Sequence, residues 1–302
     1  MEKFYSKFRK IFNANKELLE KLSKTKYKNM TLNCRGQLVD LNTPKIIGIL
    51  NLTPDSFYDG GKYNSIDKSL KQCENLLKDG ATFVDVGALS TRPGAGNLTL
   101  DIEKKRLFPI LESLLHKFPD CLFSIDTFRS EIAEESLKIG ACMINDISGG
   151  EFDEKMYSVV GKYNSPYILM HRKGDSKTMQ NNPKYINIVT EIISFFYEKI
   201  QIANDNDIKD VIIDVGFGFG KSIEQNYELL KNIKLFQSLN CPVLTGISRK
   251  SMIWKYLDIS PKKTLNGTTF LHAFALQGGS QLLRVHDVKR AKECIDLLQA
   301  LS

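Results

Sequence analysis

The sequence predicts an α/β protein folded as a (β/α)8 barrel, the TIM barrel, and three observations support this prediction. From residue 44 onwards, short apolar segments alternate with longer segments of helical period. Eight such apolar segments fit into roughly 250 residues, the usual size of this barrel. The segments are continuously apolar, which is typical of parallel strands covered by helices. A doubly wound open sheet is the alternative, but no G-x-G-x-x-G motif follows a strand to favour it.

The predicted strands follow one another at regular spacing along the chain. Before them, residues 30–43 predict a short hairpin that precedes the barrel. β-branched and aliphatic residues dominate each strand segment, as expected for strands in a buried parallel sheet. The strand segments are residues 45–50, 82–86, 122–125, 143–144, 167–170, 211–213, 242–245 and 281–284.

Helix signals fill the intervals between these strands. Ser222 and Gln225 form a capping-box pattern ahead of apolar residues at helical spacing. Asn182 followed by Pro183 predicts the start of an earlier helix, because proline is favoured at the first helical position. Further helices are predicted over residues 64–80, 102–116, 252–257 and 264–276.

Composition is that of a globular protein of 302 residues, 25% of them charged, with a formal net charge of +7. Residues 1–29 are rich in lysine and predict a basic helical extension, whereas residues 30–302 predict one barrel domain. Aromatic residues are too sparsely interleaved to indicate nucleic-acid binding, and no segment approaches the about 20 apolar residues of a membrane span. Six scattered cysteines without a C-x-x-C pair predict reduced thiols and a cytoplasmic location.

Polar residues follow the apolar segments where the strands should end. The carboxyl ends of the strands form the catalytic face of such a barrel, so we expect these side chains to share one rim. One such residue alone could be a helix cap or a turn, but they recur at every strand. We expect Asp85 and Asp146 to anchor loops, and leave a structural or a functional role open for His171. The main rim residues are Asn51, Asp126, Asn145, Asp214, Lys250, Arg284 and His286.

The acids and the amide form one chemical group within this rim. Asp126 and Asp214 accept hydrogen bonds, and Asn145 both donates and accepts. Together they suit a flat heterocycle with an amino–imino edge, such as an aminopyrimidine. The GFGFG segment at residues 216–220 lacks the spacing of a P-loop and instead predicts the close approach of a flat ligand beneath Phe219.

The cations form the second group. Lys250, Arg284 and His286, with Asn51 nearby, suit a phosphate or pyrophosphate, bound directly or through Mg²⁺. The loops after the last two strands are a common phosphate site in this fold. The residues alone therefore predict a barrel enzyme that acts on a phosphorylated heterocycle.

The motifs along residues 30–300 make a specific resemblance. In order and spacing they resemble the dihydropteroate synthase family of pterin-binding enzymes. The motifs are GILNLTPDSFYDGG (48–61), STRPGA (90–95), SIDTFRSE (124–131), INDISGG (144–150), ILMHRKG (168–174), TMQNNPKY (178–185), IIDVGFGFGKS (212–222), GISRKSM (246–252) and RVHDV (284–288).

The resemblance implies that 6-hydroxymethyl-7,8-dihydropterin pyrophosphate and 4-aminobenzoate are the substrates, and 7,8-dihydropteroate and pyrophosphate the products. It implies Mg²⁺ as cofactor, with Asn51 as its protein ligand, and a homodimer. The implied catalytic residues are Lys250, Asp126, Asp214 and Asn145. The implied pterin-binding residues are the same four together with Phe219. Thr91, Arg92, Pro93 and Ser251 are implied on the aminobenzoate side, and Asn51, Arg284 and His286 at the diphosphate.

Two mobile loops are also implied. Asp55, Ser56 and Phe57 belong to the first, and Thr91, Arg92 and Pro93 to the second. Two other hypotheses keep a pterin-binding barrel but change its role. One is methyl transfer to a corrinoid protein, which needs no diphosphate site, so the cations count against it. The other is a pterin-binding paralogue without catalytic activity.

Overall fold

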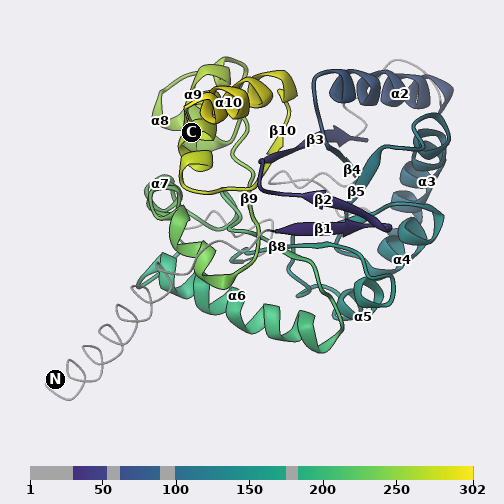
Figure 1. Cartoon of the computed structure of the whole chain (residues 1–302), viewed down its shortest axis with the longest axis horizontal. Coiled ribbons are helices and arrows are strands. Elements are labelled where there is room, and N and C mark those ends of the chain that lie inside the picture. Colours follow the sequence, from purple (N-terminus) through teal and green to yellow (C-terminus); the bar gives the residue numbers. More distant parts are fainter. Residues whose placement is uncertain (1–29, 53–61, 89–98, 175–182, 302) are drawn as a thin grey trace, which may run out of the picture.

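The computed structural model describes residues 30–52, 62–88, 99–174 and 183–301 (Figure 1). The predicted extension, residues 1–29, lies outside the described residues. So do both predicted mobile loops, including Thr91, Arg92 and Pro93.

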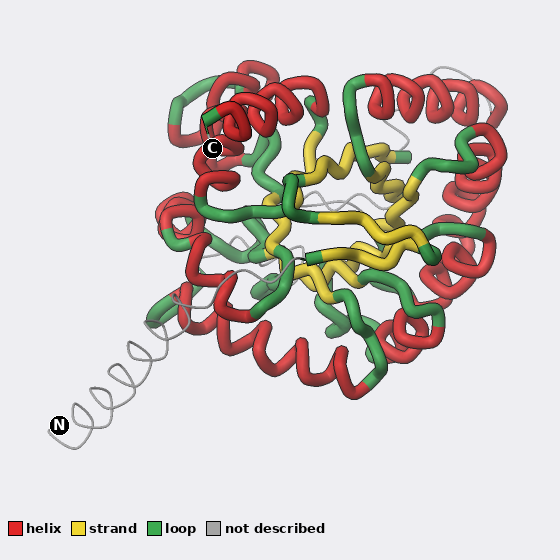
Figure 2. Tube along the Cα trace, in the orientation of Figure 1, coloured by secondary structure: helices red, strands yellow, loops and turns green. Residues whose placement is uncertain are grey.

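Eight parallel strands close into a barrel, which confirms the predicted fold class (Figures 1 and 2). Each strand pairs with the next along the chain, and the last, β10, pairs with the first, β3. The strands are β3 (Lys45–Asn51), β4 (Phe83–Gly87), β5 (Leu122–Asp126), β6 (Met143–Asp146), β7 (Tyr167–Met170), β8 (Val211–Asp214), β9 (Val243–Thr245) and β10 (Leu282–Val285).

Helices surround this barrel on the outside (Figure 2). Helix α7 begins with the predicted capping box, since Ser222 accepts from the Gln225 backbone N–H and the Gln225 side chain accepts from that of Ser222. The helices are α2 (Lys62–Lys78), α3 (Leu100–Lys117), α4 (Ser130–Ile139), α5 (Lys155–Lys162), α6 (Ile188–Asp205), α7 (Ile223–Lys231), α8 (Ser251–Tyr256), α9 (Leu265–Gln277) and α10 (Val288–Ala300), with 3-10 turns η2 (Ile233–Leu239) and η3 (Pro261–Lys263).

The predicted start of α6 at Asn182 and Pro183 is wrong. The helix begins at Ile188, and the Asn187 side chain caps it by accepting from the Thr190 backbone N–H at 3.0 Å. Tertiary hydrogen bonds hold the preceding residues outside the helix. The carbonyl of Pro183 accepts from the Gln225 side chain, and the Tyr185 hydroxyl donates to the carbonyl of Gly220.

A two-stranded hairpin covers the amino-terminal end of the barrel, as predicted for residues 30–43. It consists of β1 (Thr31–Cys34) and β2 (Gln37–Asp40), which pair antiparallel. Leu32 and Val39 pack against the apolar residues that fill the lower interior of the barrel. The Asn33 backbone N–H also donates to Asp210, just before β8, at 2.6 Å.

The barrel walls have two apolar sides. The side that faces the helices belongs to one large core, which includes Val84, Ile125 and Ile213. The interior side belongs to a second core, shared with the hairpin and formed by Ile47, Phe83, Leu122, Met143, Ile168, Ile212, Leu244 and Leu282.

No helix among the described residues is long and apolar enough to cross a membrane.

Candidate active site

Strand alternation places a set of polar side chains inside the barrel, above its apolar interior layer. Successive side chains of a strand point to opposite faces, so residues two apart share a face. Phe83 on β4 faces the interior, and therefore Asp85 does too. The same rule assigns the interior, toward the carboxyl ends of the strands, to Asn51, Asp85, Ser124, Asp126, Asn145, Asp214 and Arg284.

Arg284 joins two of the buried carboxylates. Its Nε donates to Asp85 Oδ2 at 2.7 Å and one terminal nitrogen donates to Asp126 Oδ2 at 2.8 Å. Asn145 also donates to Asp85 Oδ2, at 2.9 Å. The second oxygens of Asp85 and Asp126 are buried and have no hydrogen-bond partner within the described part of the chain. Buried acceptors are rarely left unpaired, so these two oxygens mark places for donors of a ligand.

The electrostatics of this cluster follow from its burial. Burial raises the pKa of Asp126 to about 7, against the opposing effect of Arg284. Burial likewise raises the pKa of Asp214, against Lys250. Burial would lower the pKa of Arg284, but Asp85 and Asp126 outweigh it and raise that pKa, so the guanidinium stays charged. The carboxylates therefore lie among the cations Arg284, Lys250 and Lys221, and the unpaired oxygens of Asp85 and Asp126 favour a ligand that donates hydrogen bonds.

The loop after β8 brings an aromatic ring and a second cation to the same end of the barrel. The Asp214 side chain accepts from the Gly216 backbone N–H at 2.8 Å, which starts the loop. Lys250, on the loop after β9, donates to the carbonyl of Phe217, and its Nζ lies 4.5 Å from the centroid of the Phe219 ring. Burial lowers the pKa of Lys250 to about 8, although Asp214 opposes this.

The loops after β9 and β10 are tied together. The Ser248 hydroxyl lies 3.0 Å from His286 Nδ1 and accepts from the His286 backbone N–H at 3.2 Å. Arg249 forms two hydrogen bonds to Asp287, at 2.9 and 2.6 Å. The charge of Arg249 is therefore used within the protein, whereas Lys250 beside it reaches the barrel mouth. Ser251 is the first residue of α8.

The structure brings together most of the site residues predicted from the sequence. Direct contacts link Arg284 to Asp126, and close electrostatic interactions link Lys250 to Asp126, Asp214 and Arg284. Asn145 joins them through Asp85. Three described residues of the prediction remain: Asn51 ends β3, Ser251 begins α8 and His286 follows β10, all on the side of the strand carboxyl ends.

Asp85 was expected only to anchor a loop, and that expectation is wrong. It contacts two predicted site residues from inside the barrel. Asp146 does anchor its loop, because it accepts from the backbone N–H groups of Ser148 and Gly150 and from the Tyr167 hydroxyl. His171 is buried, and burial lowers its pKa to about 2, so its imidazole is neutral. Its Nδ1 has no hydrogen-bond partner within the described part of the chain.

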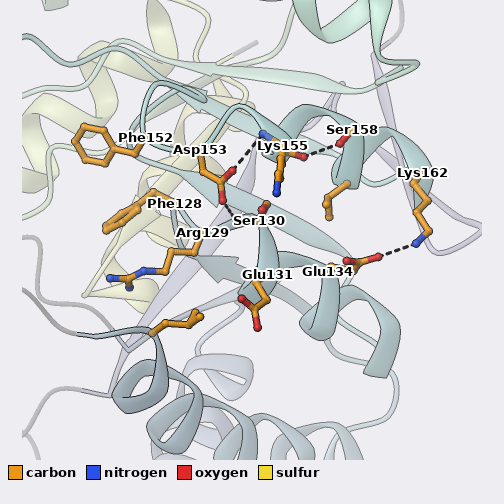
Figure 3. Close-up of a pocket in the computed structure, with 12 residues that line it drawn as sticks. Phe128, Arg129, Ser130, Glu131, Glu134, Phe152, Asp153, Lys155, Ser158 and Lys162 are labelled. Atoms are coloured by element: carbon orange, nitrogen blue, oxygen red, sulfur yellow. Dashed lines mark hydrogen bonds and ion pairs between the residues drawn. The ribbon is translucent and has the colours of Figure 1, made fainter.

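A separate hollow of about 810 Å³ lies between α4, α5 and the loops that precede them (Figure 3). Its charged side chains are largely paired with the protein. Asp153 accepts from the Ser130 backbone N–H at 2.8 Å, and Lys162 bonds to Glu134 at 2.6 Å. None of the predicted site residues lines it. The candidate site is therefore the barrel mouth and not this hollow.

Comparisons with known proteins identify the family of the chain. A family model described as pterin binding enzyme matches residues 47–286. The chain therefore belongs to the pterin-binding enzyme family. Its relatives within that family include dihydropteroate synthases. The one from Escherichia coli strain K12 is 38% identical over 273 residues, which cover 90% of this chain and 96% of the relative.

Solved structures give the same result. Dihydropteroate synthase of Yersinia pestis, in a sulfonamide drug complex, superposes with a TM-score of 0.84 at 38% identity and covers 90% of this chain and 99% of its own. The Thermus thermophilus enzyme in complex with 6HMPPP has a TM-score of 0.79 at 32% identity, covering 90% and 100%. Its complex with 4-aminobenzoate has a TM-score of 0.81 at 34% identity, with the same coverage.

Proposed function

We propose that the chain is a transferase that catalyses the dihydropteroate synthase reaction of folate biosynthesis. It joins 6-hydroxymethyl-7,8-dihydropterin pyrophosphate to 4-aminobenzoate and releases 7,8-dihydropteroate and pyrophosphate. One observation carries the proposal: buried acids with unpaired oxygens lie beside Arg284 and Lys250 at one mouth of the barrel. The dihydropteroate synthases that it resembles include structures with a pterin-class ligand and with 4-aminobenzoate.

The acids and the amide bind the pterin ring in this proposal. The unpaired oxygen of Asp126 accepts from the amino–imino edge, which supplies the donor that the protein lacks there. Asp214 and Asn145 bind further polar atoms of the ring, and Phe219 packs beside it. The Lys250 ammonium lies over the Phe219 ring, and in this proposal it also donates to the polar edge of the pterin ring.

The cations bind the diphosphate. Arg284 and His286 come from β10 and its loop, and Asn51 from the neighbouring strand β3. The described residues contain no group of three or more histidine, cysteine or acidic side chains arranged to hold a metal ion. Mg²⁺ commonly takes only one or two protein oxygens and completes its shell with water and substrate phosphate. The amide oxygen of Asn51 fits that role, and a bound Mg²⁺ would neutralise charge on the diphosphate.

The reaction then needs no protein nucleophile. The C–O bond to the diphosphate breaks and positive charge builds on the exocyclic carbon, from which the pterin ring delocalises it. Asp126 and Asp214 stabilise that charge electrostatically, because both are buried where solvent screening is weak. The amine of 4-aminobenzoate attacks the carbon, a C–N bond forms, and the new amine loses a proton.

The aminobenzoate side rests on residues that the structure describes only in part. Ser251 and Phe219 lie next to Lys250 in the chain or in space. Thr91, Arg92 and Pro93 lie outside the described residues, so their part in this side of the site stays a prediction. The variant Thr91→Ala should impair the use of 4-aminobenzoate, whereas Asp126→Asn should impair pterin binding. If both changes harmed only aminobenzoate use, this division of the site would be wrong.

A direct assay separates this function from its alternatives. Purified protein is mixed with Mg²⁺, the pterin pyrophosphate and 4-aminobenzoate, and pyrophosphate release is followed. We expect release that depends on 4-aminobenzoate. A methyl-transferring barrel or a paralogue without catalytic activity would release none under conditions where a known synthase turns over. That result would reject the proposal.

We also propose a homodimer that works in the cytoplasm. Helices α9 and α10 are packed together and expose apolar side chains, with Phe270 68%, Phe274 41% and Leu297 68% exposed. An exposed apolar group of this kind favours a second copy of the chain as partner. All six cysteines are free, which supports a reducing compartment.

A further inference from the structure

Lys221 is a buried lysine that the proposed mechanism does not use. It ends the loop after β8 and is 2% exposed. Its Nζ donates to the carbonyls of Gly216 and Phe219, both at 2.9 Å, and to that of His171 at 3.3 Å. An ammonium group has three N–H donors, so each has a backbone acceptor. A charged group is costly to bury unless it is hydrogen-bonded in this way.

These three carbonyls belong to two different loops. Gly216 and Phe219 lie after β8, whereas His171 lies after β7. The backbones of the two loops are in direct contact. A Cβ on Gly216 would lie 1.9 Å from the carbonyl oxygen of His171, and one on Gly220 would lie 2.1 Å from that of Lys173. Lys221 thus fastens the loop after β8 to its neighbour.

The fastened loop carries parts of the active site. Gly216 donates its backbone N–H to Asp214, and the carbonyl of Phe217 accepts from Lys250. The Phe219 ring lies beneath the Lys250 ammonium. A shift of this loop would therefore move the aromatic ring and the lysine together.

We propose that Lys221 is a positioning residue, which holds residues 215–220 so that Phe219 and Lys250 meet the pterin substrate. This inference rests on the proposed function, because it takes the pterin pyrophosphate as the ligand. Burial pulls the pKa of Lys221 well below its usual value, and the charge of Asp214 opposes this. A methionine would fill a similar volume but would remove one hydrogen bond from each of the three carbonyls, and only that of Gly216 would keep a donor among those described, the Phe219 backbone N–H. The loop would therefore have to rearrange.

The test compares three variants by calorimetric titration with the pterin pyrophosphate. Lys221→Met should raise the Kd of the folded protein by about 10-fold or more, and Lys221→Gln, which keeps two N–H donors, by less. Lys173→Met is the matched control. Lys173 lies on the neighbouring loop, is 45% exposed and also donates to a backbone carbonyl, that of Lys184, so its Kd should stay within about 2-fold of wild type.

A purely structural role would give a different result. It would lower the melting temperature and the fraction of binding-competent molecules, but leave the Kd of the folded fraction unchanged. If Lys221→Met fails to fold, Lys221→Gln decides by the same criterion. If neither folds, the lysine serves the fold and the inference is overturned.

The inference and the proposed function can fail separately. A wild-type protein that releases pyrophosphate, together with a Lys221→Met variant that keeps the wild-type Kd, overturns the inference alone. A wild-type protein that does not bind the pterin pyrophosphate overturns the proposed function.

Discussion

The substitution Asp126→Asn should separate the stability of the barrel mouth from its binding function. Asp126 is 6% exposed, and burial raises its pKa from 3.8 to about 7. At pH 8 the ionised carboxylate therefore destabilises the folded chain relative to the unfolded chain. Asparagine has the same shape and no charge, so the variant avoids this cost. It also loses the carboxylate that we expect to bind the pterin.

The magnitude follows from the difference in pKa. One pKa unit corresponds to about 1.4 kcal/mol, so the cost at pH 8 is about 4 kcal/mol. The folded pKa is above the unfolded one, so the folded protein takes up the proton first as the pH falls. The free energy of unfolding of the wild type therefore rises as the pH falls from about 7 towards 4. About 2 kcal/mol of this gain is reached by pH 5.5.

Urea denaturation at pH 8 and at pH 5.5 measures this difference. The variant should equal or exceed the wild type in stability at pH 8, and its relative stability should fall by about 2 kcal/mol at pH 5.5. Asp153→Asn is the control. Burial would raise the pKa of Asp153, but hydrogen bonds from Ser130 lower it below its usual value, so it stays ionised at both pH values. This control should lose the same stability at each pH. Equal destabilisation of Asp126→Asn at both pH values would refute the reasoning.

Three further predictions concern binding, backbone and assembly. Pterin affinity should fall as the pH is lowered through about 7, because protonation turns one Asp126 oxygen into a donor and removes the negative charge that faces the pterin. A Kd that is constant from pH 8 to 6 would contradict this. Gly216→Ala should lower the free energy of unfolding by at least about 2 kcal/mol, because φ is +68° and the new Cβ would meet the carbonyl of His171. The control Gly36→Ala, at φ +84° with open space around the new Cβ, should lower it by only about 1 kcal/mol, and urea denaturation measures both. The double variant Phe270→Glu, Phe274→Glu should be monomeric by sedimentation, and an unchanged dimer would place the interface elsewhere.

The barrel could be predicted from the sequence because each strand is short, apolar and followed by a helix. The predicted segments match the eight observed strands to within two residues. The start of α6 could not be predicted in this way. Pro183 carries a local helix signal, but its carbonyl accepts a hydrogen bond from the distant Gln225, which holds it outside the helix. Such tertiary contacts override local preference and leave no trace in the local pattern.

The candidate site was largely predictable from the residues that close the strands, and Asp85 shows the limit of that rule. Asp85 lies in the middle of β4 and one interior layer below Asp126, and the Arg284 side chain contacts both. Its alternation with Phe83 was the available signal. Asp146 is three residues after the interior residue Met143, so alternation places it on the outer side of β6, where it contacts Tyr167. Counting from a buried interior residue therefore distinguishes the two aspartates better than their distance from a strand end.

Among the described residues, the hairpin of β1 and β2 closes the amino-terminal end of the barrel. Leu32 and Val39 pack into that amino-terminal end, so we expect ligands to enter and leave the interior at the carboxyl ends of the strands. Entry at one end of the barrel imposes an order on ligand binding and release. A ligand that contacts the deepest polar layer, where Asp85 lies, must bind before a ligand that occupies the rim above it. The deeper ligand can dissociate only after the ligand at the rim has dissociated.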